Sequence, residues 1–600
     1  VALAVAAIPE ALTSIVTIVQ AFGTQKMAKE NAIIKKLKAV ESLGCVSVIC
    51  SDKTGTLTQN KMTVQQVYVD GKVIDGKELD LTDQTQRYLL YDAVLTNDSS
   101  IVDGKGIGDP TEYALLEMFR KIQVLPDSYF GKMGMHEDAL RKVMDRIEEV
   151  PFDSDRKLMS TKYRIHGVPT ILTKGAVDVL LDRCVSVRYG DGIRPMTEEE
   201  KEKIRLQNQH FSENGLRVLA FAYKESNEML CAQAECGYVF LGLISMVDPP
   251  RPESVRAVAE AKQAGIKTVM ITGDHKVTAT AIAKQIGIFE EGDLALTGME
   301  LDAMSEEELD QKIDKISVYA RVSPENKIRI VEGWQRRGNI VSMTGDGVND
   351  APALKKADIG VAMGITGTEV SKDAAAMILA DDNFATIIKA VANGRNVYRN
   401  IKNAVLYLLS GNTAAIFAVL YTSLMALPVP FAPVQLLFIN LLTDSLPALA
   451  IGMEPADEGL LKEKPRDPKE GLMTKDFMIQ MAAQGVLIAA VVITAFYLGL
   501  RSSTAMASTM AFSTLTLARL FHGFNCRGKK SIFKLGFGTN PYSLYAFGAG
   551  ALLLGLVIFI PGLHRLFQVQ SMPVVSLLQV AVLAFIPTLM IQMKRLICKK

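Results

Sequence analysis

Seven apolar segments of bilayer-spanning length constrain the fold of this chain more than any other feature of its sequence. They cover residues 1–22, 404–425, 432–451, 477–500, 505–524, 542–560 and 574–593. A helix of about 20 apolar residues crosses the hydrocarbon core of a bilayer. The roughly 380 residues between the first two segments are much more polar. The sequence therefore predicts a multidomain membrane protein with an α-helical transmembrane bundle and a large soluble part.

Lys and Arg residues are distributed unevenly between the two sides of the expected bundle. Thirteen lie in the loops and the tail on the side of the soluble part, and two, Arg501 and Arg565, lie on the opposite side. Positive charges accumulate on the cytoplasmic side of membrane proteins, so we expect the soluble part to be cytoplasmic. The short external loops favour a bacterial cell membrane that the chain crosses several times.

The overall composition excludes several other classes of protein. The net charge of +1 comes without a basic stripe, which argues against nucleic acid as a partner. The seven cysteines contain no Cys-x-x-Cys pair, so we expect neither a structural zinc site nor a disulfide framework.

A carboxylate follows the strand that we expect at residues 46–50. Asp52 opens the sequence Asp-Lys-Thr-Gly-Thr, and open α/β sheets bind ligands at the carboxyl ends of their strands. Asp52 is therefore our candidate for a nucleophile that accepts a phosphoryl group. A carboxylate attacks phosphorus well only when Mg²⁺ and an ammonium group neutralise the negative charge. Asp346 and Asp350, which follow a second expected strand, suit Mg²⁺, and Lys327 can supply the ammonium group.

A third expected strand ends at Thr272-Gly273-Asp274, where a hydroxyl and backbone N–H groups can hold phosphoryl oxygens. Each motif alone is weak, because strands followed by Gly-Asp turns occur in many sheet proteins. In this order the set resembles the phosphorylation domain of P-type ATPases, which has a haloacid-dehalogenase-like α/β core. The resemblance implies that Asp52 forms an aspartyl phosphate. It also implies Asp52, Thr54 and Asp346 as Mg²⁺ ligands, Thr272 and Gly273 as phosphoryl contacts, Lys327 as counter-charge, and Asp274, Asn349 and Asp350 as supporting residues.

The motifs divide the soluble part into two pieces that alternate along the chain. We expect a transmembrane helix at residues 1–25, a phosphorylation domain in two parts at 26–60 and 248–385, an inserted α+β nucleotide-binding domain at 61–247, and further transmembrane helices at 386–600. The insertion is long enough to have its own hydrophobic core. The stretch Asp248-Pro249-Pro250-Arg251, whose two prolines disfavour a helix, marks the end of the insertion.

The inserted part contains aromatic and basic residues that suit a nucleotide. Phe152 can stack on an adenine ring, Lys174 can line the same pocket, and Arg217 can reach phosphates. Taken alone, Phe152 is better explained as a core residue and Lys174 as a solvated surface group. The resemblance to P-type ATPases implies instead that these residues bind ATP together with Glu112 and Arg156. A Walker-type ATPase is excluded, because the sequence has no G-x-x-x-x-G-K-[ST] loop.

Two of the apolar segments carry carboxylates, which are costly in a membrane unless they bind something. Glu10 follows Pro9, which frees backbone carbonyls; the alternative is a kinked packing helix with a protonated Glu10. Asn440, Thr443 and Asp444 lie on adjacent turns of another segment. Carboxylates, amides and carbonyls together suit Ca²⁺, which accepts six to eight oxygens.

These membrane motifs narrow the resemblance to the type IIA calcium pumps of the sarcoplasmic-reticulum kind, from their fourth transmembrane helix to their C-terminus. A heavy-metal pump would need thiolates where Ile8-Pro9-Glu10 stands. The resemblance implies a transported Ca²⁺ held by the carbonyls of Val5, Ala6 and Ile8 and by the side chains of Glu10, Asn440 and Asp444, with Asn412 and Thr443 as further candidates.

The chain departs from two-site calcium pumps at two positions. The glutamate expected three residues after Asn412 is absent, and Arg519 stands at or near the position of another liganding glutamate. A guanidinium group repels a divalent ion and fills a cavity with its own charge. We therefore expect one Ca²⁺ per cycle. We also expect Arg519 to modulate transport by pairing with Asp444 after Ca²⁺ has left, and proton counter-transport is an option.

Other functions stay open on the sequence alone. A pump for Mn²⁺, for Na⁺ and K⁺, or for H⁺ would use a similar cage, and a membrane-anchored phosphatase of the dehalogenase superfamily would share Asp52, Lys327 and Asp346. A channel or scaffold would need neither set. The resemblance also implies an actuator domain and three membrane helices upstream of Val1, so we expect a monomer that does not complete turnover from this chain alone.

Overall fold

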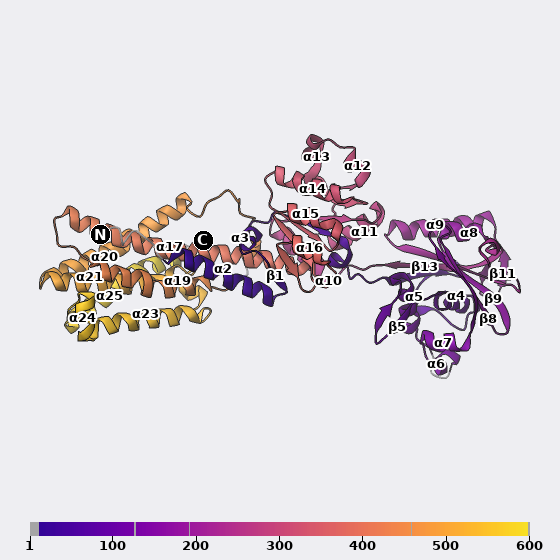
Figure 1. Cartoon of the computed structure of the whole chain (residues 1–600), viewed down its shortest axis with the longest axis horizontal. Coiled ribbons are helices and arrows are strands. Elements are labelled where there is room, and N and C mark those ends of the chain that lie inside the picture. Colours follow the sequence, from indigo (N-terminus) through magenta and orange to yellow (C-terminus); the bar gives the residue numbers. More distant parts are fainter. Residues whose placement is uncertain (1–10, 125–127, 191, 458, 598–600) are drawn as a thin grey trace.

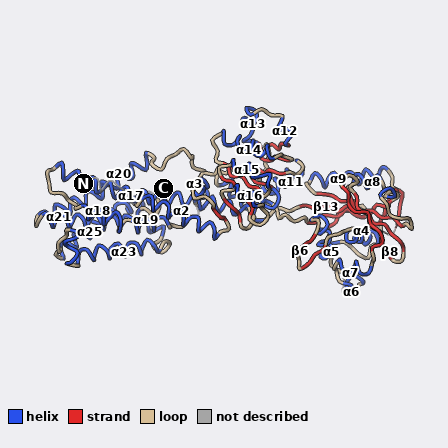
Figure 2. The backbone as a smooth tube through the Cα atoms, viewed as in Figure 1, coloured by secondary structure: helices blue, strands red, loops and turns tan. Residues whose placement is uncertain are grey.

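The computed structural model describes residues 11–124, 128–190, 192–457 and 459–597. The predicted calcium ligands Val5, Ala6, Ile8 and Glu10 lie outside these residues. The molecule is elongated, and three parts follow one another along its longest axis: a helical bundle, an eight-stranded sheet with surrounding helices, and a nine-stranded sheet (Figure 1). Figure 2 shows the strands gathered in two separate regions, one next to the bundle and one at the opposite end of the molecule.

The eight-stranded sheet combines two stretches of chain that are far apart in the sequence. Its order is β1 (Ala32–Ile34), β19 (Met377–Leu379), β18 (Ile359–Met363), β17 (Val341–Gly345), β2 (Val48–Asp52), β14 (Lys267–Thr272), β16 (Ile316–Ala320) and β15 (Leu294–Thr297). All neighbouring strands run parallel except β1 and β19. The carboxyl ends of β2, β14 and β17 therefore lie at one edge of the sheet. These strands are buried on both faces, which explains their continuous apolar runs.

Helices cover this sheet and supply its connections. They are α3 (Lys38–Leu43), α10 (Pro252–Gln263), α11 (Lys276–Ile286), α12 (Gly298–Asp302), α13 (Glu306–Lys312), α14 (Pro324–Arg336), α15 (Ala351–Lys356) and α16 (Glu369–Ala374).

The nine-stranded sheet is formed by the chain between β2 and β14. Its main order is β11 (Gly192–Pro195), β10 (Cys184–Tyr189), β13 (Tyr238–Val247), β12 (Arg217–Glu225), β9 (Val168–Gly175), β8 (Leu158–Ile165) and β7 (Arg146–Asp153), and β3 (Thr63–Val69) pairs with β13 and with β4 (Lys72–Asp75). Thr63 lies opposite Val247, so the chain enters and leaves this part on neighbouring strands.

The helices of this part are α4 (Gln84–Leu95), α5 (Pro110–Lys121), α6 (Tyr129–Met133), α7 (Glu137–Val143), α8 (Val177–Asp182) and α9 (Glu198–Glu213), and β5 (Ser100–Val102) pairs with β6 (Lys105–Ile107) in a separate ladder. A separate apolar core joins α4 and α5 to the sheet through buried residues such as Leu89, Leu116 and Phe221.

The bundle consists of helices that range from four to 41 residues in length. It contains α2 (Leu12–Lys29), α17 (Phe384–Leu424), α18 (Pro433–Phe438), α19 (Ser445–Gly452), α20 (Lys475–Leu500), α21 (Thr504–Asn525), α22 (Ile532–Leu535), α23 (Pro541–Phe559), α24 (Pro561–Phe567) and α25 (Val574–Ile597). A π-helical turn, Ile439–Thr443, joins α18 to α19.

Helix α17 links the eight-stranded sheet to the bundle. It is 41 residues long, and its first turns pack Phe384 and Val391 into the same apolar core as Met363 of the sheet. Further along, Ala414 and Ala418 belong to the core of the bundle. The structure therefore provides a continuous helical connection between the two parts.

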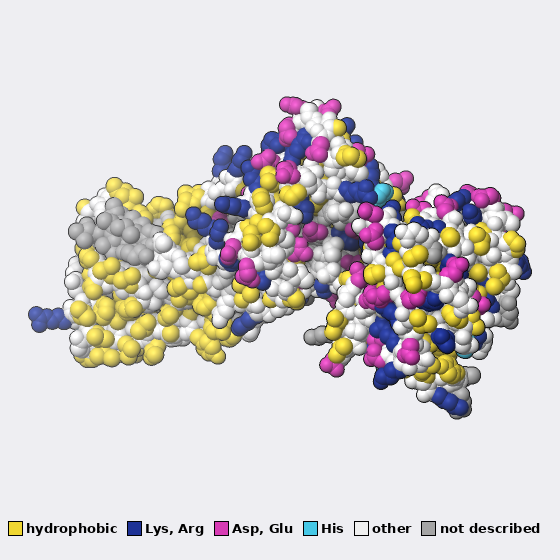
Figure 3. All heavy atoms as spheres, turned by 45° about the vertical axis from the view of Figure 1, so that its right-hand side comes forward, with side chains coloured by type: hydrophobic (Ala, Val, Ile, Leu, Met, Phe, Trp, Pro, Cys, Tyr) yellow, Lys and Arg dark blue, Asp and Glu magenta, His cyan; other side chains and the backbone are white. Residues whose placement is uncertain are grey.

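Among the described residues, five helical stretches are long and apolar enough to cross a membrane: Phe384–Leu424, Pro433–Gly452, Lys475–Leu500, Pro541–Phe559 and Val574–Ile597. The segment predicted at residues 505–524 forms α21, which carries Arg519 and is not one of the five. The segment predicted at residues 1–22 is described only from residue 11, as part of α2. Seven spans therefore stay a prediction. Hydrophobic side chains cover much of the visible face of the bundle, whereas charged side chains are frequent over the other two parts (Figure 3).

Candidate functional site

Asp52 is the last residue of the central strand β2. Its backbone N–H donates to the hydroxyl of Thr344 on β17, with 2.8 Å between the two heavy atoms. The chain then turns sharply, and Gly55 adopts a φ of 75°, which a residue with a side chain rarely does. The turn leaves the Asp52 side chain 19% exposed at the edge of the sheet, whereas Cys50 and Ser51 before it are fully buried. Asp52 is therefore accessible to a ligand.

Lys327 joins Asp52 to a second carboxylate. Helix α14 begins with Ser323 as its N-cap, and this start places Lys327 in the first turn. The Lys327 Nζ atom lies 3.1 Å from Asp52 Oδ2 and 2.6 Å from Asp350 Oδ1. Residues that are 275 positions apart in the sequence thus form one ion pair.

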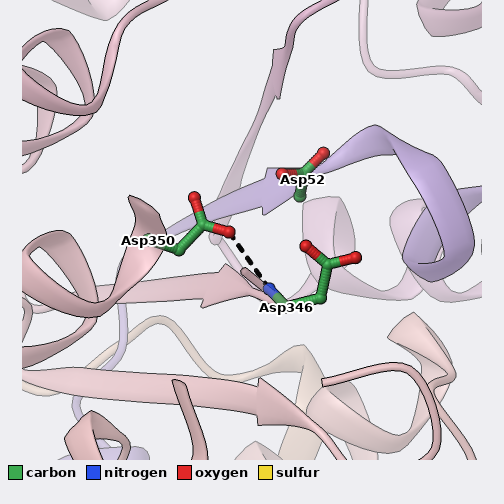
Figure 4. A group of neighbouring side chains, drawn as sticks. All are labelled: Asp52, Asp346 and Asp350. Atoms are coloured by element: carbon green, nitrogen blue, oxygen red, sulfur yellow. Dashed lines mark hydrogen bonds between the residues drawn. The ribbon is translucent and has the colours of Figure 1, made fainter. Parts of the chain in front are cut away.

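Asp350 also fixes the loop that carries Asp346. Its Oδ2 atom accepts a hydrogen bond from the backbone N–H of Asp346 at 3.1 Å (Figure 4). It also accepts one from the backbone N–H of Gly347 at 3.0 Å. Asp350 is thereby engaged by Lys327 on one side and by the loop on the other. This leaves the carboxylates of Asp52 and Asp346 as the better candidates to bind a ligand.

The three carboxylates make the site rich in negative charge. Burial raises the pKa of Asp52; the positive charge of Lys327 opposes this effect and the negative charge of Asp350 adds to it. Burial also raises the pKa of Asp346, with the charges of Asp52 and Asp350 acting in the same direction. Burial disfavours the charged form of Lys327, but these carboxylates outweigh burial and raise its pKa. One ammonium group faces three acids, so a further cation would be stabilised here.

The donor set fits a hard divalent cation. One oxygen from each of Asp52, Asp346 and Asp350 lies within 4.8 Å of the others. Carboxylate oxygens are the ligands that Mg²⁺ prefers. Of the other residues predicted at this site, Thr54 is exposed in the turn after β2, and Asn349 is exposed in the 3-10 turn Val348–Asp350.

The turn after β14 faces the same edge of the sheet. Thr272 is buried, and its hydroxyl accepts a hydrogen bond from the backbone N–H of Asp274 at 3.1 Å. A Cβ atom added at Gly273 would meet no atom within 4 Å, so the space beside this backbone is open. The Asp274 side chain pairs with Lys53 at 2.6 Å. The sequence analysis did not identify Lys53, although its position directly after Asp52 was a usable signal.

In the nine-stranded part, Lys174 and Glu112 form a close pair. The Lys174 Nζ atom on β9 donates to Glu112 Oε1 on α5 at 2.6 Å. The expectation, for Lys174 taken alone, of a solvated surface group is wrong, because the side chain is only 7% exposed. The expectation of a core position for Phe152 is also wrong, because Phe152 lies on the edge strand β7 and is 62% exposed.

The other two predicted nucleotide residues have different partners. Arg217 donates to the hydroxyl of Thr111, next to Glu112, at 3.2 Å. Arg156 pairs with the buried Glu235 and donates to the carbonyl of Pro151. The structure thus brings Arg217 close to the Lys174–Glu112 pair and anchors Arg156 to Glu235.

In the bundle, Asp444 forms an ion pair with Arg519. Both side chains are almost fully buried, at 1% and 2% exposed. Arg519 Nη2 also donates to Asn412 Oδ1 at 2.9 Å, so this predicted residue lies at the same place. Asn440 and Thr443 are buried on the π-helical turn before Asp444, and the Thr443 hydroxyl donates to the backbone carbonyl of Ile439.

Two residues that the sequence analysis missed complete this group. The Tyr407 hydroxyl donates to Asp444 Oδ1 at 3.2 Å. A Cβ atom added at Gly411 would lie 2.3 Å from Arg519 Nε, so the guanidinium group packs where a larger residue would not fit. A tyrosine and a glycine within one apolar segment were the available signals, but neither is specific.

Comparisons with known proteins agree with this architecture. Residues 85–253 match the family described as P-type ATPase, cytoplasmic domain N, and residues 428–597 match the family described as cation transporting ATPase, C-terminus. The chain is 50% identical over 582 residues to a calcium-transporting ATPase of Listeria monocytogenes. The matched region is 95% of the chain and 64% of the relative. It is 45% identical to calcium-transporting ATPase 1 of Bacillus cereus, over 98% of the chain and 67% of the relative.

A third relative matches the full length of this chain. The calcium-transporting ATPase of Bacillus subtilis is 42% identical over 100% of the chain and 69% of its own length. The chain thus spans a little less than two thirds of the Listeria relative and somewhat more of the two Bacillus relatives. The family predicted from the sequence motifs is confirmed, and the chain belongs to the P-type cation-transporting ATPases.

Proposed function

We propose that this chain is the catalytic and transport core of a pump that exports Ca²⁺ from the cytosol at the expense of ATP, through an aspartyl phosphate on Asp52. The observation that carries this proposal is the meeting of Asp52, Lys327 and Asp346 at the edge of one parallel sheet. The relatives are named as calcium-transporting ATPases, which supports Ca²⁺ as the ion.

The residues at this edge can divide the chemistry of phosphoryl transfer among them. The Asp52 carboxylate attacks the terminal phosphorus of ATP; a new oxygen–phosphorus bond forms, the bond to ADP breaks, and ADP leaves with the electron pair. Lys327 offsets the negative charge, while the Thr272 hydroxyl and the Gly273 backbone bind phosphoryl oxygens. Mg²⁺ held by Asp52, Thr54 and Asp346 would neutralise phosphate charge.

The nine-stranded part is proposed to bind the nucleotide. Phe152 offers an exposed aromatic face for the adenine ring, and Lys174, Glu112 and Arg217 provide charged groups near one another. We assign Arg156 a supporting role, because Glu235 holds it. The proposed boundaries of this nucleotide-binding domain are residues 61–247, between the two parts of the phosphorylation domain.

The bundle is proposed to carry one Ca²⁺ per cycle. Asp444 and Asn440, with Glu10 and the carbonyls of Val5, Ala6 and Ile8, would supply oxygen ligands, and Asn412 and Thr443 are nearby candidates. Arg519 would occupy the position of a second ion and pair with Asp444 when Ca²⁺ is absent. Ca²⁺ binding would have to break this pair, so we assign Arg519 a modulating role in ion release. The membrane is proposed to be the cell membrane, with both sheets in the cytoplasm.

Phosphoenzyme formation on the full-length protein tests the proposal. Incubation with ATP labelled at the terminal phosphate should give an acid-stable, hydroxylamine-labile phosphoprotein that requires Ca²⁺, and a labelled-calcium isotherm should give one ion per phosphorylation site. If the amount of labelled phosphoprotein depends on Mn²⁺, Na⁺ or H⁺ and not on Ca²⁺, the transported ion is a different cation. Phosphate release without any dependence on a transported ion would favour a membrane-anchored phosphatase.

A further inference from the structure

A fully buried carboxylate lies on the helix that packs against the strand of Lys174, and the proposed function does not use it. Asp92 is on helix α4, which packs against strands β9 and β12, and its side chain has no exposed surface. Its Oδ2 atom accepts a hydrogen bond from the backbone N–H of Ala222 at 3.2 Å. Its Oδ1 atom has no hydrogen-bond partner among the described residues. A buried carboxylate with one unused oxygen is costly and needs a reason.

A purely structural reason exists for part of this arrangement. The pairing of β12 with β13 shifts register between Phe221 and Ala222, and such a bulge leaves a backbone N–H without a strand partner. Asp92 accepts that N–H. However, a neutral amide oxygen would satisfy the same N–H at a smaller cost of desolvation. The bulge therefore explains why an acceptor is present at this position, but not why the acceptor carries a negative charge.

Lys174 supplies a reason for the charge. Ala222 lies opposite Thr173 on β9, so Asp92 approaches the sheet one residue away from Lys174. Burial lowers the pKa of Lys174, and the negative charges of Glu112, Asp92 and Asp98 oppose this effect. In turn, burial raises the pKa of Asp92 to about 7, and the nearby Thr96 hydroxyl, the positive charge of Lys174 and the backbone N–H groups of Ala222 and Thr173 oppose that shift. The two buried groups stabilise each other's charged forms.

Several other charged groups around α4 have partners of their own. Glu137 on α7 pairs with Arg120 of α5, and Arg141 donates to backbone carbonyls at the end of α4. Strand β12 contributes Arg217, Lys224 and Glu225 near its two ends, and β13 contributes no charged residue. Lys174 is the charged group that acts most on Asp92.

We propose that Asp92 is a positioning residue for Lys174: its ionised carboxylate keeps the Lys174 ammonium group charged and held toward Glu112, and so makes nucleotide affinity depend on pH. This inference deepens the proposed function and rests on the nucleotide role of Lys174. The direction of the effect follows from charge. Below about pH 7 Asp92 is neutral and gives Lys174 no support, whereas above it the carboxylate is ionised and Lys174 retains its proton to higher pH.

The variant Asp92→Asn separates this role from the structural one. Its amide oxygen can still accept the N–H of Ala222, but it carries no charge at any pH. The wild-type protein and the variant should therefore behave alike near pH 6 and differ above about pH 8. In the variant, Lys174 should lose its proton at lower pH, because a supporting negative charge is gone.

The experiment measures how fast an amine-reactive isothiocyanate modifies Lys174 in the full-length protein, by peptide mapping with mass spectrometry between about pH 6 and 9.5. Only the neutral amine reacts. At about pH 8.5 the variant should react about three- to tenfold faster than the wild type, and at about pH 6 the two rates should agree. Lys162 on β8 is an internal reference in the same samples: it is buried, and its Nζ donates to the carbonyl of Glu228 at 2.6 Å. Its rates should be equal in both proteins.

The wild type alone gives a second test if the variant folds poorly. The logarithm of the Lys174 rate should rise with a slope below one around pH 7, where Asp92 ionises, and with a slope near one elsewhere. Coincident profiles for the two proteins, or a uniform slope of one in the wild type, would overturn the inference. Protection by ATP tests the proposed function separately. If ATP slows modification of Lys174 in neither protein, the nucleotide role fails while the coupling to Asp92 is still measured.

Discussion

Two of the carboxylate–cation pairs in this protein have opposite surroundings. Asp52 and Lys327 lie at the open edge of a sheet, with side chains that are 19% and 12% exposed. Asp444 and Arg519 lie inside the bundle, with side chains that are 1% and 2% exposed. At the edge, water or a ligand can replace either partner. In the bundle, neither charge can lose its partner without leaving the other uncompensated.

The choice of cation fits this difference. The Lys327 ammonium group is compact and contacts both Asp52 and Asp350. It can therefore move toward the negative charge of an incoming phosphoryl group. Arg519 carries a planar guanidinium group with several donors, one of which reaches Asn412. A partly exposed pair suits the chemistry that we propose at the sheet edge, whereas a buried pair suits holding a charge away from water. Substitutions at the first should change rates, and substitutions at the second should change stability and ion binding.

Asp52→Asn should have the largest effect, because the amide has no nucleophilic oxygen of comparable strength. We expect phosphoenzyme formation to fall by more than about a thousandfold. The midpoint of thermal unfolding should change little, since the side chain lies at an open edge. Labelled phosphoprotein in acid-quenched samples is the measurement, and nucleotide binding serves as the control. If the variant is still labelled, Asp52 is not the residue that accepts the phosphoryl group.

Arg519→Met should have the next largest effect and should act on stability. Removing one partner of a buried pair costs about 3–5 kcal/mol, because the other charge is left uncompensated. The unfolding midpoint in detergent or lipid should therefore fall, and saturating Ca²⁺ should restore part of the loss by binding Asp444. Arg519→Lys, which keeps the charge, is the matched control. Equal midpoints for the wild type and Arg519→Met would show that the pair does not stabilise the bundle.

Lys327→Met should slow phosphorylation by about a hundredfold, because it removes the charge that faces Asp52 and Asp350. Lys53→Met is the comparison, since Lys53 pairs with Asp274 rather than with Asp52. We expect the smaller loss from Lys53→Met. Single-turnover rates of phosphoenzyme formation at saturating ATP provide the test, and a larger loss at Lys53 would reverse our assignment of the two lysines.

Gly411→Ala should give the smallest of these effects. The new methyl group would meet Arg519 Nε, and overpacking of this kind costs about 1–3 kcal/mol. Gly548→Ala on α23 is the matched control, because a Cβ atom there meets nothing within 4 Å. The two variants should differ in thermal unfolding midpoint. If both variants have the unfolding midpoint of the wild type, the close packing around Arg519 does not contribute to stability.

Local patterns were sufficient to predict much of the soluble part. The strands expected before Asp52, Thr272 and Asp346 lie where the sequence placed them, as β2, β14 and β17. Runs of β-branched residues and the turns after them are local signals, and parallel pairing then brings the strand ends together. The roles assigned to these residues remain predictions.

Exposure was harder to predict than secondary structure. Taken alone, Phe152 was expected in a core and Lys174 on the surface, and both expectations failed. Phe152 is on an edge strand, and Lys174 is covered by the helix that carries Glu112. The identity of a side chain does not specify which face of a sheet a distant helix covers.

The amino-acid sequence by itself determined the composite nature of the protein, the order of its motifs and its family, because apolar length, strand periodicity and turn residues act over short distances. Only the tertiary structure decided which charges meet. Lys327 could have served Asp52 alone but is shared with Asp350, Arg519 joins Asp444 to Asn412, and the charges of Asp92 and Lys174 act on each other. These pairings depend on how helices and strands from distant parts of the chain pack, and the energy of a buried charge is set by the neighbours that packing provides.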